Sequence, residues 1–238
     1  MKIIDKDKVK KESLIENLKK EVSILMLVDH PNIVALREVL ASNTKIYLVL
    51  DYVPGQELFK VLGKKELKIE TNGKIDENTS RKYIVQIIRA LGHCKSKTIA
   101  HRDIKLENII IDKNQNLKVL DFGLSSLFID PANINLIMKT TCGTINYIAP
   151  EVIEKSGYDG HLADIWATGV VLFCCLAGFL PFEGEKVSDI LYTIVQAKVE
   201  YPSHFSSSVK DLLNKIFETN PKRRITLDQI IEHPWIKK

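Results

Sequence analysis

The sequence has few cysteines and no long hydrophobic segment, and these absences exclude several classes of protein. Its four cysteines show no CxxC spacing, so neither a zinc site nor a disulfide framework is indicated. Two of them, Cys174 and Cys175, are adjacent, and a vicinal pair rarely forms a disulfide. We therefore expect all four, including Cys94 and Cys142, to be free thiols that act as small hydrophobic side chains. That pattern favours the reducing cytoplasm, or the nucleus, as the setting.

Membrane insertion, secretion and nucleic-acid binding are not favoured either. The longest apolar run, residues 169–181, is too short to span a bilayer and predicts a buried core helix. No charged-then-apolar signal peptide opens the chain. The net charge is +4, but the lysines are scattered among acidic residues and form no basic stripe. With 45% hydrophobic and 27% charged residues, the composition is typical of a globular protein with a substantial core.

Two polar motifs carry the chemistry: HRDIKLEN at residues 101–108 and DFG at residues 121–123. In order they supply a carboxylate, a lysine, an amide and a second carboxylate, which are Asp103, Lys105, Asn108 and Asp121. Moving a phosphoryl group requires positioning and charge neutralisation, and the Mg²⁺ that accompanies it prefers oxygen ligands. The alternative, in which the two aspartates only cap a turn and a strand end, leaves the lysine and the asparagine unexplained. The motifs thus predict transfer of a metal-bound phosphoryl group to a hydroxyl.

Hydrophobic periodicity divides the chain into a strand-rich first part and a mainly helical second part. The expected strands are 1–5, 33–40, 46–50, 109–111 and 117–120. A first helix is indicated by apolar residues at helical spacing, namely Leu14, Leu18, Val22 and Leu25. Later helices are expected at 57–62, 77–96, 161–177, 187–197, 207–218 and 226–232, with Ser207 and the Thr226–Gln229 pair as cap signals. The linker falls at 52–56, so the predicted units are residues 1–53 and 54–238.

Further motifs lie around the two polar ones: HPNIV at 30–34, LVLDYVPG at 48–55, TTCGTINYIAPE at 140–151 and ADIWATG at 163–169. Taken together and in this order, the motifs resemble those of the eukaryotic protein kinases over essentially the whole chain. Within them the chain is most similar to the calcium/calmodulin-dependent and AMP-activated group of Ser/Thr kinases. The resemblance implies an α+β, two-lobed fold. An incomplete antiparallel sheet plus one helix would form the N-lobe (1–53), and a mainly helical C-lobe would follow (54–238).

The resemblance also assigns catalytic roles. It implies that Asp103 accepts or orients the proton of the attacking protein hydroxyl and that Lys105 lies beside the transferring phosphate of ATP. Asn108 and Asp121 would hold Mg²⁺. Thr144 would contact Asp103 and Lys105, a feature of Ser/Thr kinases. Ile145 stands where relatives usually have proline, which affects the expected shape of the substrate-docking loop.

For ATP, the resemblance implies a lysine–glutamate pair, Lys2 and Glu21, that couples the phosphates to the helix position. The base would lie against the linker, where the implied contacts are the Leu50 side chain, the backbone of Asp51 and Val53, Ile110 as the floor, and Glu57 at the ribose. Gly55-Gln56 replaces the two glycines that often follow this linker in the family. Glu57 and Glu107 would favour a basic residue upstream of the target hydroxyl.

Regulation is implied by the segment after DFG. Thr140 matches the position phosphorylated in related kinases by an upstream kinase, Thr141 is the alternative, and Arg102 would pair with the phosphate. Ser126 replaces a basic residue that many relatives place near that phosphate. Architectural roles are implied for Asp164, which would cap the catalytic loop, for a buried Glu151–Arg224 ion pair, and for an apolar column of His101, Phe122, Leu25 and Leu36.

No GxGxxG motif precedes Lys2, although kinases cover the ATP phosphates with this loop. Three functions are therefore weighed. The first is an active Ser/Thr kinase whose N-terminus is cut short in the gene model. The second is a kinase-fold binding or scaffolding protein that is inactive in this form. The third is a small-molecule kinase, which the APE and ADIW segments disfavour because they build a protein-substrate docking region. Any regulatory tail or subunit is unknown at this point.

Overall fold

The computed structural model describes residues 1–9, 18, 22, 26, 28–63, 73–120, 144–154 and 157–238. Several positions named above lie outside the described residues: Leu14, Glu21, Leu25, Asp121, Phe122, Ser126, Thr140, Thr141 and Cys142. For Thr144 the backbone is described but the side chain is not. Within these bounds the chain has the predicted mixture of small antiparallel sheets and several helices.

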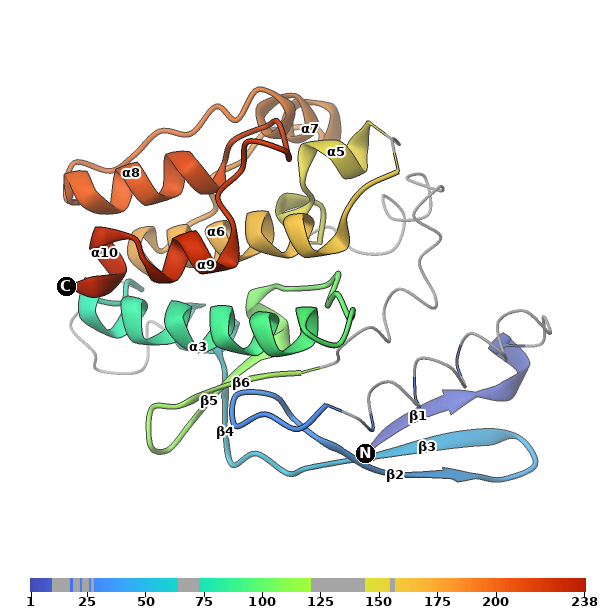
Figure 1. Ribbon diagram of the computed structural model, residues 1–238. Helices are drawn as coiled ribbons and strands as arrows, with labels where there is room; N and C mark the ends of the chain where they lie inside the picture. Colours follow the sequence, from blue (N-terminus) through green and yellow to red (C-terminus); the bar gives the residue numbers. More distant parts are fainter. Residues whose placement is uncertain are drawn as a thin grey trace.

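The first part of the chain forms a three-stranded antiparallel sheet in the order β1-β3-β2. Its strands are β1 (Lys2–Asp5), β2 (Leu36–Ala41) and β3 (Lys45–Leu50), at the bottom of Figure 1. These segments are rich in β-branched and large apolar residues, which suit a half-buried pleated surface. The register pairs Ile4 with Ile46 and Lys2 with Leu48, so these four residues share one face. Ile4 and Leu48 are buried there.

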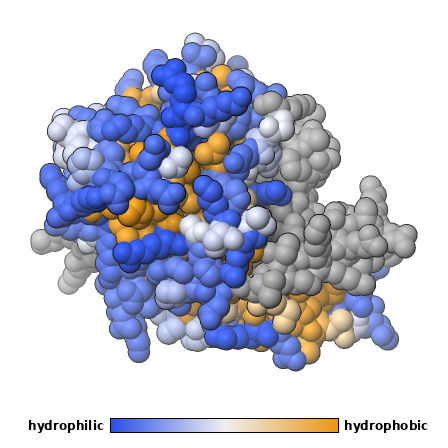
Figure 2. Space-filling model, viewed as in Figure 1, coloured by the Kyte–Doolittle hydropathy of each residue, from blue (hydrophilic) through white to orange (hydrophobic). Residues whose placement is uncertain are grey.

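The opposite face of this sheet carries an apolar row. The register places Ile3 opposite Tyr47 and Leu40 opposite Tyr47, so the three side chains line up across the strands. Ile3, Leu40 and the neighbouring Met1 are exposed. Figure 2 shows apolar residues at the surface in this region, and others over the helical part of the chain.

The second part of the chain is mainly helical. Its helices are α2 (Leu58–Gly63), α3 (Glu77–Lys95), α5 (Pro150–Ile153), α6 (Gly160–Ala177), α7 (Val187–Val195), α8 (Ser207–Ile216), α9 (Leu227–Ile231) and α10 (Pro234–Lys237). Three short strands form a second antiparallel sheet in the order β4 (Gly55–Glu57), β5 (Ile109–Asp112) and β6 (Leu117–Val119). One-turn 3₁₀ helices are η1 (Lys6–Val9), η2 (Leu106–Asn108) and η3 (Thr144–Tyr147). In Figure 1 this small sheet lies between α3 and the first sheet.

Helix α6 is the centre of the core. It is long and apolar enough to cross a membrane by composition, but 78% of it is buried inside the protein. This confirms the core helix predicted from its apolar run. Trp166 stacks on Phe182 at a ring distance of 5.5 Å and meets Phe217 edge-on at 5.1 Å. A Cβ at Gly169 would lie 2.4 Å from Ile216 Cγ2, so glycine lets α8 approach closely.

Several predicted element ends were wrong. The helices expected to end at residues 197 and 218 end at Val195 and Ile216. The second strand was expected from Ile33, but β2 begins at Leu36, because Ile33 forms a parallel bridge to Val119 of the second sheet. The N-cap of α8 is Ser206 and not Ser207, since the Ser206 hydroxyl accepts from the Val209 N–H. The Thr226–Gln229 capping box at the start of α9 is confirmed. Strand β4, which covers the end of the predicted linker and the first residue of the helix expected at 57–62, was not predicted, and neither was helix α10.

The segment before β2 connects the two parts of the fold. Its Asn32 side chain donates to the Leu117 carbonyl at 2.8 Å and to Gln86 Oε1 at 3.1 Å. The backbone adds a pair of hydrogen bonds, from Val34 N–H to the Val119 carbonyl and from Val119 N–H to the Asn32 carbonyl. The first sheet is therefore held to β6 and α3 immediately beside the strands that carry the candidate site.

Candidate active site

The HRDIKLEN loop lies between α3 and β5 and is held in shape by the His101 ring. This histidine is fully buried. Its Nδ1 accepts from the Asp103 N–H at 3.1 Å, and its Nε2 lies 2.8 Å from the Leu120 carbonyl. Since Nδ1 accepts and Nε2 faces a carbonyl, the geometry assigns the neutral tautomer with hydrogen on Nε2. One ring thus fixes the backbone at Asp103 and at the end of β6.

Asp164 of α6 also anchors the catalytic loop. Its two carboxylate oxygens accept from the N–H groups of His101 and Arg102, each at 2.7 Å. Arg102 has a φ of 65°, a left-handed conformation that costs a non-glycine residue free energy, so the surrounding structure must hold it. Burial raises the pKa of Asp164 to about 7, against the two N–H groups that favour its ionised form. The predicted capping role of Asp164 is confirmed.

The predicted catalytic groups converge in one cluster. Lys105 Nζ lies 2.9 Å from Asp103 Oδ1 and 2.8 Å from Oδ2. The side-chain amide of Asn108 donates to the Asp103 carbonyl at 2.8 Å and to Asp103 Oδ2 at 2.7 Å. The Asp103 and Lys105 side chains are 9% and 19% exposed, so little water competes for these contacts. The carboxylate is therefore fixed in direction, as a positioned proton acceptor must be.

The same geometry determines what Asn108 can bind. Both hydrogen bonds of its side chain use the amide nitrogen, which leaves the amide oxygen as the group available to a ligand. An uncharged oxygen of this kind suits a hard cation such as Mg²⁺. The predicted second ligand, Asp121, lies outside the described residues, and among the described residues no group of three or more His, Cys, Asp or Glu side chains could hold a metal.

The linker that would face the adenine base runs from β3 to β4. The Asp51 N–H donates to the Ala35 carbonyl at 3.0 Å. Within the described part of the chain, neither the Asp51 carbonyl nor the Val53 N–H has a backbone hydrogen-bond partner. An acceptor and a donor two residues apart match the edge of adenine, which offers an amino group and a ring nitrogen. Leu50 is half-buried beside them.

Strand β4 brings the linker against β5. Glu57 pairs with Ile110 and Gly55 with Asp112, so the half-buried Ile110 lies next to the linker as predicted for the floor. A Cβ at Gly55 would lie 2.3 Å from the Ile111 carbonyl oxygen, and therefore only glycine fits this approach. The Glu57 carboxylate contacts Lys60 Nζ at 2.7 Å on the surface, and its predicted ribose contact stays a prediction.

Lys2 lies in β1 opposite Leu48, and its predicted partner Glu21 is outside the described residues. The pair therefore stays a prediction. His101 and Leu36 of the predicted apolar column are both buried, while Phe122 and Leu25 are not described. Cys94, Cys174 and Cys175 are free and buried, and burial raises the pKa of the Cys94 and Cys175 thiols to about 12. These three thiols are inert core side chains, as expected.

The sequence did not reveal an apolar cavity beside the catalytic loop. The cavity measures about 190 Å³ and is lined by residues that include Phe59, Leu106, Glu107, Tyr147, Phe179 and Leu180. Phe59 and Phe179 are half exposed at its rim. Among the described residues, the buried Oε2 of Glu107 has no hydrogen-bond partner. The only sequence signal was Glu107 itself, because the two phenylalanines come from α2 and from the end of α6.

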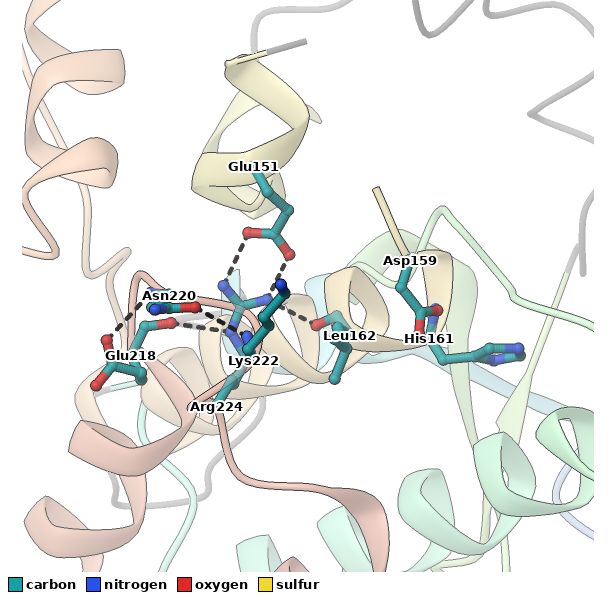
Figure 3. A network of polar contacts seen from close by, with 8 residues as sticks. All are labelled: Glu151, Asp159, His161, Leu162, Glu218, Asn220, Lys222 and Arg224. Carbon is teal, nitrogen blue, oxygen red and sulfur yellow. Dashed lines mark hydrogen bonds and ion pairs between the residues drawn. The ribbon is translucent and has the colours of Figure 1, made fainter. Parts of the chain in front are cut away.

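The predicted ion pair of Glu151 and Arg224 is confirmed and is shown in Figure 3. Two guanidinium nitrogens donate to the two carboxylate oxygens at 2.6 and 2.8 Å. The Arg224 and Glu151 side chains are 0% and 5% exposed. Arg224 also donates to the Leu162 and Glu218 carbonyls and lies over the Trp166 ring. Arg224, which lies between α8 and α9, thus joins α5, the helix after the substrate-docking segment, to the core helix α6.

The anchored Asp103–Lys105–Asn108 cluster, the linker edge and the two-part fold together define a protein kinase domain. The family model described as "Protein kinase domain" matches residues 1–236. The chain therefore belongs to the protein kinase family.

Among curated proteins, the chain is 48% identical to CBL-interacting protein kinase 31 and 47% identical to CBL-interacting protein kinase 2, both of Oryza sativa subsp. japonica. It is 45% identical to CBL-interacting serine/threonine-protein kinase 20 of Arabidopsis thaliana. Each alignment covers 100% of this chain and 51%, 52% and 52% of the three relatives, respectively. The chain thus spans about half the length of the curated relatives it matches.

Proposed function

We propose that the chain carries the catalytic site of a Ser/Thr protein kinase, which transfers the γ-phosphoryl group of ATP to a protein hydroxyl. The observation that carries this proposal is the Asp103 carboxylate held by Lys105 and Asn108 on a loop anchored to Asp164. A scaffold does not need this arrangement of a base, a cation and a metal-ligand oxygen. The family and the relatives named as serine/threonine-protein kinases support the same function.

Each residue has a task in the proposed reaction. Asp103 accepts the hydrogen bond of the incoming hydroxyl and takes its proton as the oxygen–phosphorus bond forms and the bond to ADP breaks. Lys105, already 2.8 Å from Asp103, lies where it can neutralise charge on the transferring group. The free amide oxygen of Asn108, with Asp121, would hold Mg²⁺. When bound, this ion neutralises charge on the ATP phosphates.

The substrate side favours a protein with a basic residue near the target hydroxyl. Glu107 presents a buried, unpartnered carboxylate oxygen beside an apolar cavity. A buried charge without a partner costs free energy, and a cationic substrate side chain supplies that partner. Phe59 and Phe179 at the cavity rim would accommodate an apolar side chain of the same peptide. Thr144 and Lys105 are proposed to select Ser and Thr, as the resemblance implies.

Regulation through the segment after DFG is also part of the proposal. The Arg102 side chain is exposed and lies over the start of α6, where glycine at position 160 leaves room for it. It is therefore available to bind a phosphate on Thr140, or on Thr141, added by an upstream kinase. The relatives are named for interaction with CBL, and we propose a regulatory partner of that kind for this protein. The free thiols favour a cytoplasmic or nuclear setting.

A thermal-shift experiment tests nucleotide binding by this chain. Saturating ATP with Mg²⁺, at about one hundred times Kd, should stabilise the folded protein by about 2.7 kcal/mol and raise Tm by several degrees. ATP with EDTA should give a smaller shift, since the Asn108 oxygen then has no ion to bind. The absence of any shift with ATP and Mg²⁺ would contradict the proposal for this chain.

A further inference from the structure

A β-bulge in the first sheet directs a surface arginine at the linker. Leu36 pairs with Leu50, and the next pair along is Glu38 with Val49, so Arg37 is the extra residue of β2. A bulge of this kind re-aims the side chain of the bulged residue. Here the Arg37 side chain reaches Asp51, the first residue after β3.

The contact between them is a two-pronged ion pair. Arg37 Nε donates to Asp51 Oδ1 at 2.6 Å, and a terminal nitrogen of the guanidinium donates to Oδ2 at 2.8 Å. The hydrogen bonds from Arg37 lower the pKa of Asp51, and the charge of Lys118 acts in the same direction. The side chains of Arg37 and Asp51 are 65% and 38% exposed, so the pair contributes little to overall stability. Its bidentate geometry does, however, fix the orientation of Asp51.

Asp51 is thereby constrained on several sides. Its N–H is bonded to the Ala35 carbonyl, its carboxylate is bonded to Arg37 of the first sheet, and Lys118 of β6 attracts that carboxylate from the second sheet. The group left without a backbone partner, among the described residues, is its carbonyl. That carbonyl and the Val53 N–H are the linker groups that match the edge of adenine in the candidate active site.

We propose that Arg37 is a positioning residue for nucleotide binding: through Asp51 it orients the linker carbonyl that accepts from the amino group of adenine. This inference rests on the proposed kinase function. Among the described residues, Arg37 pairs with Asp51, which lies on the linker and not on the catalytic loop. Its effect therefore falls on base recognition and not on the phosphoryl-transfer step.

Recognition of the base is tested with ATP and ITP. Hypoxanthine has a carbonyl oxygen where adenine has the amino group, so ITP cannot donate to the linker carbonyl, while its phosphates are the same. We expect Arg37→Met to raise Kd for ATP·Mg about threefold to fivefold, the factor expected when an exposed bidentate pair is lost. Kd for ITP·Mg should change less than twofold. In steady-state kinetics KM for ATP should rise, while kcat should stay within twofold of the wild-type value.

Further variants separate a positioning effect of the Arg37–Asp51 pair from a nonspecific effect of replacing a surface arginine. Arg37→Lys keeps the charge but loses the fork and should fall between wild type and Arg37→Met. Arg37→Met is expected to lower the preference for ATP over ITP, measured as the ratio of the two Kd values. The double variant Arg37→Asp with Asp51→Arg should recover at least half of that loss. Arg223→Met removes another exposed arginine, which pairs with Glu218 far from the linker, and should leave the ATP-to-ITP ratio of Kd values unchanged.

The outcomes distinguish the inference from the function on which it rests. If wild type binds ATP and Arg37→Met binds ATP and ITP with unchanged constants, the inference alone is overturned. An equal loss for both nucleotides also overturns it, because the effect would then lie outside the base. If wild type does not bind ATP·Mg at all, the proposed function falls, and the inference falls with it.

Discussion

Replacing Arg224 with methionine is expected to lower the free energy of unfolding by about 3–5 kcal/mol. The reason is the partner left behind, because the Glu151 side chain is only 5% exposed and both its oxygens are bonded to Arg224. Without the guanidinium, a carboxylate remains buried with no cation, and the Leu162 carbonyl loses a donor as well. Urea denaturation monitored by circular dichroism measures the change.

The neighbouring residue provides a matched control. Arg223 makes a longer contact with Glu218, 3.6 Å, and its side chain is 75% exposed, so Arg223→Met should change stability by less than about 1 kcal/mol. The double variant Arg224→Met with Glu151→Leu removes both charges and should recover much of the loss. Equal effects of Arg224→Met and Arg223→Met would show that the buried pair does not support the fold.

Replacing Asp164 with asparagine is expected to reduce kcat about 100-fold, because the catalytic loop would shift. Asparagine keeps one accepting oxygen, but its NH₂ group then faces the N–H of either His101 or Arg102, and that hydrogen bond is lost. The φ of 65° at Arg102 loses its restraint, and Asp103 is the next residue. Stability should fall by about 1–3 kcal/mol near neutral pH. Steady-state kinetics and denaturation measure the two effects.

Thr168→Val is the control for that variant. Its hydroxyl donates to the Asp164 carbonyl within the same buried helix, so the substitution should reduce stability without changing kcat.

The pH dependence of stability is a second measurement of the role of Asp164. The folded pKa of Asp164, about 7, lies above its ordinary value of 3.8, so the folded state binds this proton more tightly. The stability that this proton contributes is complete below pH 3.8 and is lost as pH rises through 7. The free energy of unfolding of Asp164→Asn should lack this pH-dependent contribution. An Asp164→Asn enzyme with the wild-type kcat would contradict the anchoring role.

The structural features that depend on nearby residues in the sequence were mostly predicted. The α3 and α6 helices were expected within one or two residues of their bounds, α3 from apolar residues at helical spacing and α6 from its long apolar run. The roles of Asp164 and of the Glu151–Arg224 pair followed from motif order in a family whose fold is shared. Asp103, Lys105 and Asn108 lie within six positions of one another along the chain, so their convergence on one loop followed directly.

What the sequence did not predict depends on contacts between distant segments. Ile33 reads as the start of a strand, but its backbone pairs with Val119 in the other sheet. Arg37 was not singled out, because a bulge changes side-chain direction and a two-residue period does not show it. The cavity beside Glu107 joins Phe59 to Phe179, which are far apart in the chain. Helix α10 is short, and the hydrogen bonds from Arg81 and to Glu77 of α3 hold Trp235 in place.

Transfer of ³²P from [γ-³²P]ATP with Mg²⁺ to a protein substrate tests the central claim most directly. The wild-type chain should label serine and threonine but not tyrosine, and Asp103→Asn should reduce the rate by about 100-fold to 10,000-fold while still binding ATP. The change is isosteric, and the Lys105 and Asn108 side chains can both still reach the residue. Equal rates for the two proteins, or no labelling by a wild type that binds ATP, would contradict the account and favour a kinase-fold binding module.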